Sequence, residues 1–185
     1  MTLSSRDLDR IGFRYAPDAT LVLAERIVLR ANDLVAEVFG WSAREIEGQS
    51  IRILYPGPAD YALIGSRAHL AMQRDSFYRD ERFMRRKDGR VVWMEGRGRT
   101  LDSGAPERLA VWSYRPLDAA LAGPAPLTPA EKRVAGYLVN GFTSKEIAAA
   151  LACSPRTVEV HRANMIRKMN VRNSAELIHR LLSSS

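Results

Sequence analysis

The chain has 185 residues, of which 46% are hydrophobic and 26% charged, and its formal net charge is +7. This composition is typical of a globular protein in solution and leaves room for two small domains. The single cysteine excludes an intramolecular disulfide framework and favours a reducing, cytoplasmic location. No apolar run approaches the roughly 18 residues of a membrane span, so a membrane partner is not expected.

The positive charge is concentrated at one end of the chain. From residue 127 onward there are nine Lys or Arg and four Asp or Glu, a balance of +5, whereas the preceding residues have 19 and 17, a balance of +2. A local basic excess of this kind favours a polyanionic partner such as double-stranded DNA.

Residues 1–15 predict an N-terminal helix or cap, and residues 16–117 predict an α+β domain. Runs rich in β-branched residues predict strands, an Asp-Gly pair at 88–89 predicts a tight hairpin, and 3.6-residue periodicity predicts helices. The result is a five-stranded antiparallel sheet with flanking helices. The expected strands are 20–25, 26–30, 79–86, 90–99 and 107–115, and the expected helical segments are 32–39, 42–48 and 59–74, with a further short element at 51–55.

Residues 118–126 contain four alanines, two prolines and one glycine, which predicts a linker between domains. After it, residues 127–185 predict an all-α domain of four helices. Thr128 with Glu131, and Thr143 with Glu146, have the spacing of capping boxes that begin two of these helices.

The second and third helices of this domain have the pattern of a helix-turn-helix, because a short capped helix is followed by a tight connection and a longer basic helix. Ser154 and Pro155 are suited to begin the longer helix. One of its faces mixes arginines with small apolar side chains, which suits a helix that enters the major groove of DNA. Cys153 is interpreted as a small buried hydrophobe, with a redox-sensing role as the alternative. The predicted DNA-binding residues are Lys145, Ser154, Arg156, Thr157, Val160, His161, Ala163, Asn164, Arg167 and Lys168.

These motifs resemble the LuxR/FixJ-type helix-turn-helix from Leu127 to about Leu182. The segments that carry the resemblance are Leu-Thr-Pro-Ala-Glu at 127–131, Gly-Phe-Thr-Ser-Lys-Glu-Ile-Ala at 141–148 and Pro-Arg-Thr-Val-Glu-Val-His-Arg-Ala-Asn-Met at 155–165. The resemblance implies that the third helix lies in the major groove. It also implies that the last helix forms a dimer contact, through Leu177, Ile178 and Leu181.

Residues 16–117 resemble a PAS sensor domain. The supporting segments are Ala-Asn at 31–32, Val-Phe-Gly-Trp at 38–41, Glu-Ile-Glu-Gly at 45–48 and Phe-Met-Arg-Arg-Lys-Asp-Gly at 83–89. The resemblance implies a pocket between the sheet and the helices that holds haem, flavin or a small metabolite. The side chains that would line it, or would instead only fill the core, are Phe39, His69, Met72, Met84, Trp93 and Trp112.

The nature of any cofactor stays open. Haem would need His69, the single histidine of this half, as its axial ligand. A cysteinyl–flavin photoadduct is disfavoured because the single cysteine lies in the other domain. No metal site is expected, because the chain has no clustered Cys and His ligands.

No catalytic motif is present, so we expect the protein not to be an enzyme. The leading hypothesis is a cytoplasmic, homodimeric, sequence-specific DNA-binding transcriptional regulator. Its PAS-like domain would sense a small-molecule signal or mediate dimerisation. One alternative is a protein-interaction module in which the PAS-like half binds a partner protein; another is a ligand-independent DNA binder whose PAS-like half does not sense.

Overall fold

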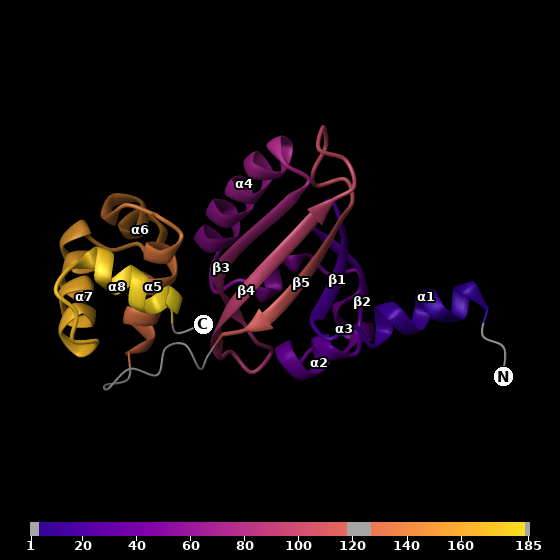
Figure 1. Cartoon of the computed structure of the whole chain (residues 1–185), viewed down its shortest axis with the longest axis horizontal. Coiled ribbons are helices and arrows are strands. Elements are labelled where there is room, and N and C mark those ends of the chain that lie inside the picture. Colours follow the sequence, from indigo (N-terminus) through magenta and orange to yellow (C-terminus); the bar gives the residue numbers. More distant parts are fainter. Residues whose placement is uncertain (1–3, 118–126, 184–185) are drawn as a thin grey trace.

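The computed structural model describes residues 4–117 and 127–183, which form an α+β domain followed by a helical domain (Figure 1). The linker expected at 118–126 lies outside the described residues. Both predicted fold classes are confirmed.

The N-terminal domain is built on one antiparallel sheet whose strands lie in the order β2-β1-β5-β4-β3. Strand β1 therefore pairs with both β2 and β5, although β5 is far away in the sequence. The β3–β4 hairpin turns at Gly89, whose φ of +84° agrees with the predicted Asp-Gly turn. The strands are β1 (Ala19–Ala24), β2 (Ile27–Ala31), β3 (Phe77–Arg85), β4 (Val91–Thr100) and β5 (Ala110–Pro116).

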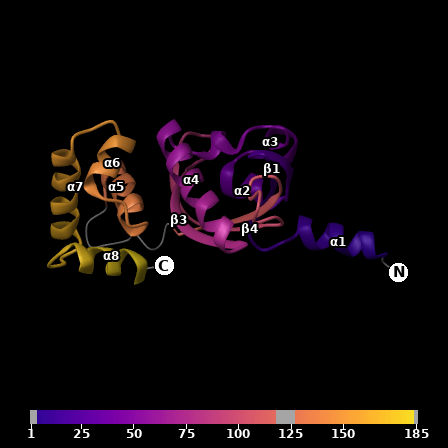
Figure 2. The same cartoon turned by 90° about the horizontal axis from the view of Figure 1, so that it is seen from above.

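Helices cover the inner face of this sheet (Figure 2). The longest, α4, buries Ile64, Ala68 and Met72 against it, because these residues recur at helical spacing. The segment at 51–55 is a single turn of 3₁₀ helix. The elements are α2 (Leu34–Phe39), α3 (Ala43–Ile46), the 3₁₀ helix η1 (Ile51–Leu54) and α4 (Pro58–Arg74).

The N-terminal helix α1 (Ser5–Arg14) projects from the domain on the side opposite the helical domain (Figure 1, Figure 2). It buries no side chain, and Leu8 and Ile11 are 55% and 39% exposed. No helix in residues 4–117 or 127–183 is long and apolar enough to cross a membrane.

The C-terminal domain consists of four helices around a common core, and its capping boxes form as predicted. Thr128 Oγ1 accepts from the Glu131 amide at 3.2 Å, and Thr143 Oγ1 accepts from the Glu146 amide at 3.3 Å. These two helices therefore begin where a threonine side chain accepts a hydrogen bond from a backbone N–H group that would otherwise be unpaired. The helices are α5 (Pro129–Val139), α6 (Ser144–Ala150), α7 (Pro155–Lys168) and α8 (Ser174–Ser183).

The two domains contact each other along the edge strand β3, where α5 packs against it (Figure 1). Phe83 and Trp93 lie opposite one another on β3 and β4, with ring centroids 4.6 Å apart. Both belong to the same buried cluster as Leu127, Val134 and other core residues of the helical domain. This end of the sheet is therefore buried on both faces, by α4 on one side and by α5 on the other.

Candidate nucleic-acid interface and sensor pocket

Helix α7 begins at the residue that the sequence indicates. The Ser154 hydroxyl accepts a hydrogen bond from the Thr157 amide at 3.1 Å, and Pro155 occupies the first turn. The connection from α6 is tight, with Ala152 at a φ of +52°. Together α6 and α7 have the short helix, turn and longer helix of a helix-turn-helix.

The two faces of α7 differ as expected. Val158 and Met165 are fully buried in the helical core. On the opposite face Val160 is 48% exposed, the Arg156 side chain is 85% exposed, and Ala163 and Arg167 are exposed. Arginines beside small side chains let a helix approach base edges closely while the guanidinium groups reach phosphates or guanines.

Three predicted contact residues are less available than expected. Lys168 forms an ion pair with Glu131 on α5, with Nζ 2.7 Å from Oε2, so its positive charge already has a partner within the domain. Asn164 is half-buried and accepts from Arg167 Nη2 at 3.0 Å, and His161 is half-buried. The predicted contact residues Lys145, Ser154 and Thr157 are exposed.

Arg162 has a role that sequence reasoning missed. Its guanidinium donates to Ser144 Oγ at 3.0 Å and to Ser174 Oγ at 2.6 Å, which are the first residues of α6 and α8. It thereby connects α7 to the starts of two other helices. No local sequence signal indicates this, since the partners are 18 and 12 residues away.

The predicted dimer residues of α8 are largely inaccessible. Leu177 and Leu181 are 0% exposed and pack inside the helical core, while Ile178 is partly buried at its edge. A helix of a small bundle must bury its apolar stripe against its own neighbours. The side chains of Leu177 and Leu181 therefore cannot contact a partner subunit in this arrangement.

Glu131 combines a capping role with a nearly buried ion pair. Its side chain is 3% exposed, accepts from the Thr128 amide at 2.7 Å and contacts Lys168 Nζ. Burial alone would raise the pKa of this carboxyl, but the bonds from Lys168 and Thr128 outweigh it and lower the pKa below its ordinary value.

We expect Glu131→Gln to lower the free energy of unfolding at pH 7 by about 1–3 kcal/mol, since the charge-assisted bond is lost while the amide still fits the capping box. A carboxyl whose pKa is lower in the native state than in the unfolded state stabilises the fold at pH values above the unfolded-state pKa. This stabilisation is lost as the pH falls through the native-state pKa. The difference between variant and wild type should therefore shrink below about pH 4. Urea unfolding at pH 3–7 measures it. Glu159→Gln is the control, because Glu159 is 55% exposed and lies 3.8 Å from Arg156; an equal effect there would contradict the prediction.

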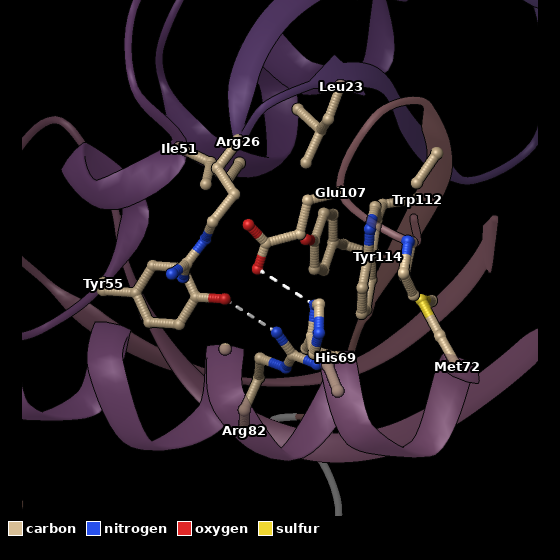
Figure 3. Close-up of a pocket in the computed structure, with 14 residues that line it drawn as sticks. Leu23, Arg26, Ile51, Tyr55, His69, Met72, Arg82, Glu107, Trp112 and Tyr114 are labelled. Atoms are coloured by element: carbon tan, nitrogen blue, oxygen red, sulfur yellow. Dashed lines mark hydrogen bonds and ion pairs between the residues drawn. The ribbon is translucent and has the colours of Figure 1, made fainter. Parts of the chain in front are cut away.

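The N-terminal domain contains a cavity of about 50 Å³ between α4 and the sheet (Figure 3). Gly65, Ala68, His69 and Met72 line it from α4. The other walls come from the strands, from η1 and from the β4–β5 connection, and they include Leu23, Arg26, Ile51, Tyr55, Arg82, Glu107, Trp112 and Tyr114.

The six side chains that were considered for the pocket divide between the cavity wall and the core. His69, Met72 and Trp112 line the cavity, whereas Phe39 and Met84 are buried in the core beside it. Trp93 also fills a core, but on the opposite face of the sheet, where it donates from Nε1 to Glu81 at 3.1 Å. Alternation along β4 predicts which residues share a face but not which face is the pocket side.

A buried arginine forms part of the cavity wall. Arg82 is 1% exposed, and its guanidinium lies 2.6 Å from Asp80 Oδ1 and donates to Tyr55 Oη at 2.8 Å (Figure 3). It also lies over the Trp112 ring, 4.8 Å from the centroid. Burial by itself would lower the pKa of Arg82, but the nearby Asp80 outweighs this and raises it, so the guanidinium stays charged.

Haem does not fit this cavity. A volume of about 50 Å³ is far smaller than a macrocycle, and His69 already faces Glu107 at 3.6 Å and Gln73 at 3.2 Å. Cys153, half-buried in the helical domain, lies in no wall of it. Within residues 4–117 and 127–183, no group of three His, Cys, Asp or Glu side chains gathers as a metal site.

The chain thus contains an α+β domain with an internal cavity and a helix-turn-helix domain with an exposed arginine face. Comparison with known families agrees with both halves. The PAS fold matches residues 12–113, and the family of bacterial regulatory proteins named luxR matches residues 125–181. The chain belongs to the PAS-fold proteins and carries a C-terminal domain of the luxR family.

Three known proteins illustrate the relationship. The transcriptional regulatory protein UhpA of Salmonella typhimurium is 54% identical over 56 residues, which are 30% of this chain and 29% of UhpA. The PAS domain of a LuxR-family regulator from Burkholderia thailandensis, solved with ethanol, is 31% identical with a TM-score of 0.58 and covers 60% of this chain and 97% of that one. VqmA of Vibrio cholerae shares the fold over 98% of this chain and 88% of its own, with 18% identity and a TM-score of 0.59. The chain spans less than a third of the length of curated relatives such as UhpA.

Proposed function

We propose that the protein is a sequence-specific DNA-binding transcriptional regulator that acts as a homodimer. The observation that carries this proposal is the exposed face of α7, where Arg156, Val160, Ala163 and Arg167 lie together on a helix that follows a helix-turn-helix connection. Two copies would place their α7 helices in successive major grooves of a two-fold site.

The charge distribution supports DNA as the partner. The excess of five positive charges after residue 127 lies in the domain that carries this face. Lys168 is matched by Glu131, so the groove-facing charge comes mainly from Arg156 and Arg167, with Lys145 at the start of α6.

Helix α1 offers an apolar surface to a second copy of the chain. Helix α1 has ten residues and buries none of them, and an isolated helix of this length is marginal in water. Its exposed Leu8 and Ile11 therefore favour dimerisation through α1, in addition to any contact made by Ile178 on α8.

The N-terminal domain is proposed to sense a small, uncharged molecule. The cavity is small, and its polar walls already have protein partners, since Arg82 pairs with Asp80 and His69 lies 3.6 Å from Glu107. Trp112, Met72 and Ile51 offer an apolar surface for the body of such a ligand. The related Burkholderia domain was solved with ethanol, which is a ligand of this size and polarity.

Salt dependence tests the DNA-binding proposal. A binding site is first selected from random duplexes, and its affinity is then measured from 50 to 200 mM salt. A dimer that makes about six phosphate contacts should give a log–log slope of roughly −5, because each contact releases condensed counterions. A slope near zero, or no enrichment of a common sequence, would contradict the proposal.

The arginine variants sharpen this test. Arg156→Ala in both subunits should weaken binding and reduce the slope by about 2 if each side chain contacts a phosphate. Arg44→Ala, at an exposed position of α3, removes the same charge from the other domain and should leave the slope unchanged.

A further inference from the structure

Two faces of helix α4 make contacts that matter here, and only one of them lines the cavity. Gly65, Ala68 and Met72 line the cavity. Asp60 and Arg67, on another face of the same helix, reach the helical domain. A displacement of α4 would therefore change both the cavity and the contact with the helical domain.

The contacts of Asp60 are almost completely buried. Tyr137 Oη on α5 donates to Asp60 Oδ1, and both residues are 4% exposed. Arg133 Nη2 lies 4.0 Å from the other carboxylate oxygen. Burial and the hydrogen bond to Asp60 together raise the pKa of Tyr137, so its hydroxyl stays protonated and able to donate.

Three further contacts surround this pair. Arg67 Nη1 donates to the Asn140 carbonyl, and the guanidinium of Arg67 lies 4.8 Å from the centre of the Phe142 ring. Asn140 in turn donates from Nδ2 to the carbonyl of Glu81 on β3. The end of α5 is thus hydrogen-bonded to both α4 and β3.

Close packing completes the contact. Gly136 on α5 lies against Phe83, and a Cβ at this position would be 2.5 Å from the Phe83 ring and 3.0 Å from Trp93. A glycine is therefore required here for α5 to approach the strand. We call Asp60, Arg67, Phe83, Gly136, Tyr137 and Asn140 the interdomain latch.

Arg82 separates the cavity from the latch. It lines the cavity and also lines a narrow crevice at the domain contact, together with Asp60, Phe83, Gly136 and Tyr137. Alternation along β3 explains this arrangement, since Arg82 points toward α4 while its neighbours Glu81 and Phe83 point toward α5.

An occupant larger than the cavity must displace one of its walls. The sheet wall is held by the ladders among β3, β4 and β5, whereas α4 is held mainly by side-chain packing. Outward movement of α4 would pull Asp60 and Arg67 away from α5, because packed elements shift as units.

We propose that the interdomain latch is a ligand-controlled contact that holds the helical domain on the PAS domain while the cavity is empty and opens when a small molecule fills it. This inference rests on the proposed sensor function. The latch does not cover the DNA-binding face, since Val160 and Arg156 remain exposed with the latch closed. It therefore acts by fixing the orientation of α7 relative to the PAS domain, and so the spacing of two such helices in a dimer.

Trp93 provides a direct readout in a full-length chain whose other two tryptophans, Trp41 and Trp112, are replaced by phenylalanine, because Trp112 lies in the cavity wall and would otherwise contribute to the emission. This chain takes the place of the wild type as the reference for the variants. Trp93 is 0% exposed and contacts the latch, so opening should shift its emission to longer wavelength and increase quenching by acrylamide. Gly136→Ala should produce both changes, because the added methyl group cannot fit beside Phe83 while alanine favours the helix itself. Gly12→Ala, whose Cβ meets nothing within 4 Å, is the matched control.

A pocket-filling variant replaces the unidentified ligand. Ala68→Leu adds three carbons to the cavity side of α4, where Ala68 is 6% exposed, and Ala62→Leu adds the same three carbons to an exposed position of that helix. We expect Ala68→Leu to reproduce the Trp93 changes of Gly136→Ala, and Ala62→Leu to resemble the wild type. Far-ultraviolet circular dichroism confirms that each variant is folded.

The outcomes separate the two levels of the proposal. If Gly136→Ala changes the Trp93 signal and Ala68→Leu does not, the coupling between cavity and latch is wrong; if neither does, the latch itself is wrong. Both readouts need no DNA, so a wild-type protein that fails to select a DNA sequence would overturn the regulatory function and leave the latch result intact. Support requires that both variants, and neither control, expose Trp93.

Discussion

Replacing Arg82 with alanine is expected to lower the free energy of unfolding of the PAS domain by about 3–5 kcal/mol. Arg82 and Asp80 are 1% and 9% exposed, and removal of the guanidinium leaves the Asp80 carboxylate buried without its counter-charge. Tyr55 also loses its donor. Urea unfolding followed by fluorescence measures the change.

The double variant Arg82→Met with Asp80→Leu is the control for this prediction. Since it removes both charges and keeps apolar volume, most of the lost stability should return. A loss below about 1 kcal/mol for Arg82→Ala would mean that water reaches Asp80 and that the pair is not the buried wall described above.

Val160→Glu is expected to abolish specific DNA binding while leaving the fold intact. Val160 is 48% exposed at the centre of the proposed groove face, so a carboxylate is tolerated in the free protein. In the complex the carboxylate would lie among phosphates, and placing like charges together costs several kcal/mol. A cost of about 3 kcal/mol lowers the affinity about 100-fold. A mobility-shift titration on the selected site measures it.

Leu29→Glu makes the same charge change at a 47% exposed position of β2, at the opposite edge of the sheet from the strand that contacts the helical domain, and should bind DNA like the wild type. Equal loss in both variants would indicate a general charge effect, and no loss in either would mean that α7 does not enter the groove with this face.

Local signals were sufficient for most of the secondary structure. The Thr128–Glu131 and Thr143–Glu146 capping boxes, the αL residue Gly40 and the Asp-Gly hairpin at Gly89 all act within a few residues of chain. For the same reason the two faces of α7 were predictable, because a 3.6-residue period separates Val158 and Met165 from Val160 and Ala163.

What local patterns do not indicate concerns residues whose partners are distant in sequence. Lys168 stays a predicted DNA contact, but no local pattern indicates its bond to Glu131, which lies 37 residues away on another helix. The position of Trp93 is not indicated either, because a buried aromatic residue in a strand gives the same pattern on either face of the sheet. Burial of Trp93 comes from α5, a helix of the other domain, which nothing local to β4 indicates.

The sequence by itself determined the two domain families, the order of their elements and the exposed arginine face of α7, since periodicity, capping and composition are properties of short segments. The tertiary structure alone decided which side of the sheet forms the cavity, that Leu177 and Leu181 are core residues, and that Asp60 meets Tyr137 across 77 residues. The physical reason is that these features depend on which surfaces come together when preformed elements pack, and the free energy of that packing is a sum over contacts between remote parts of the chain.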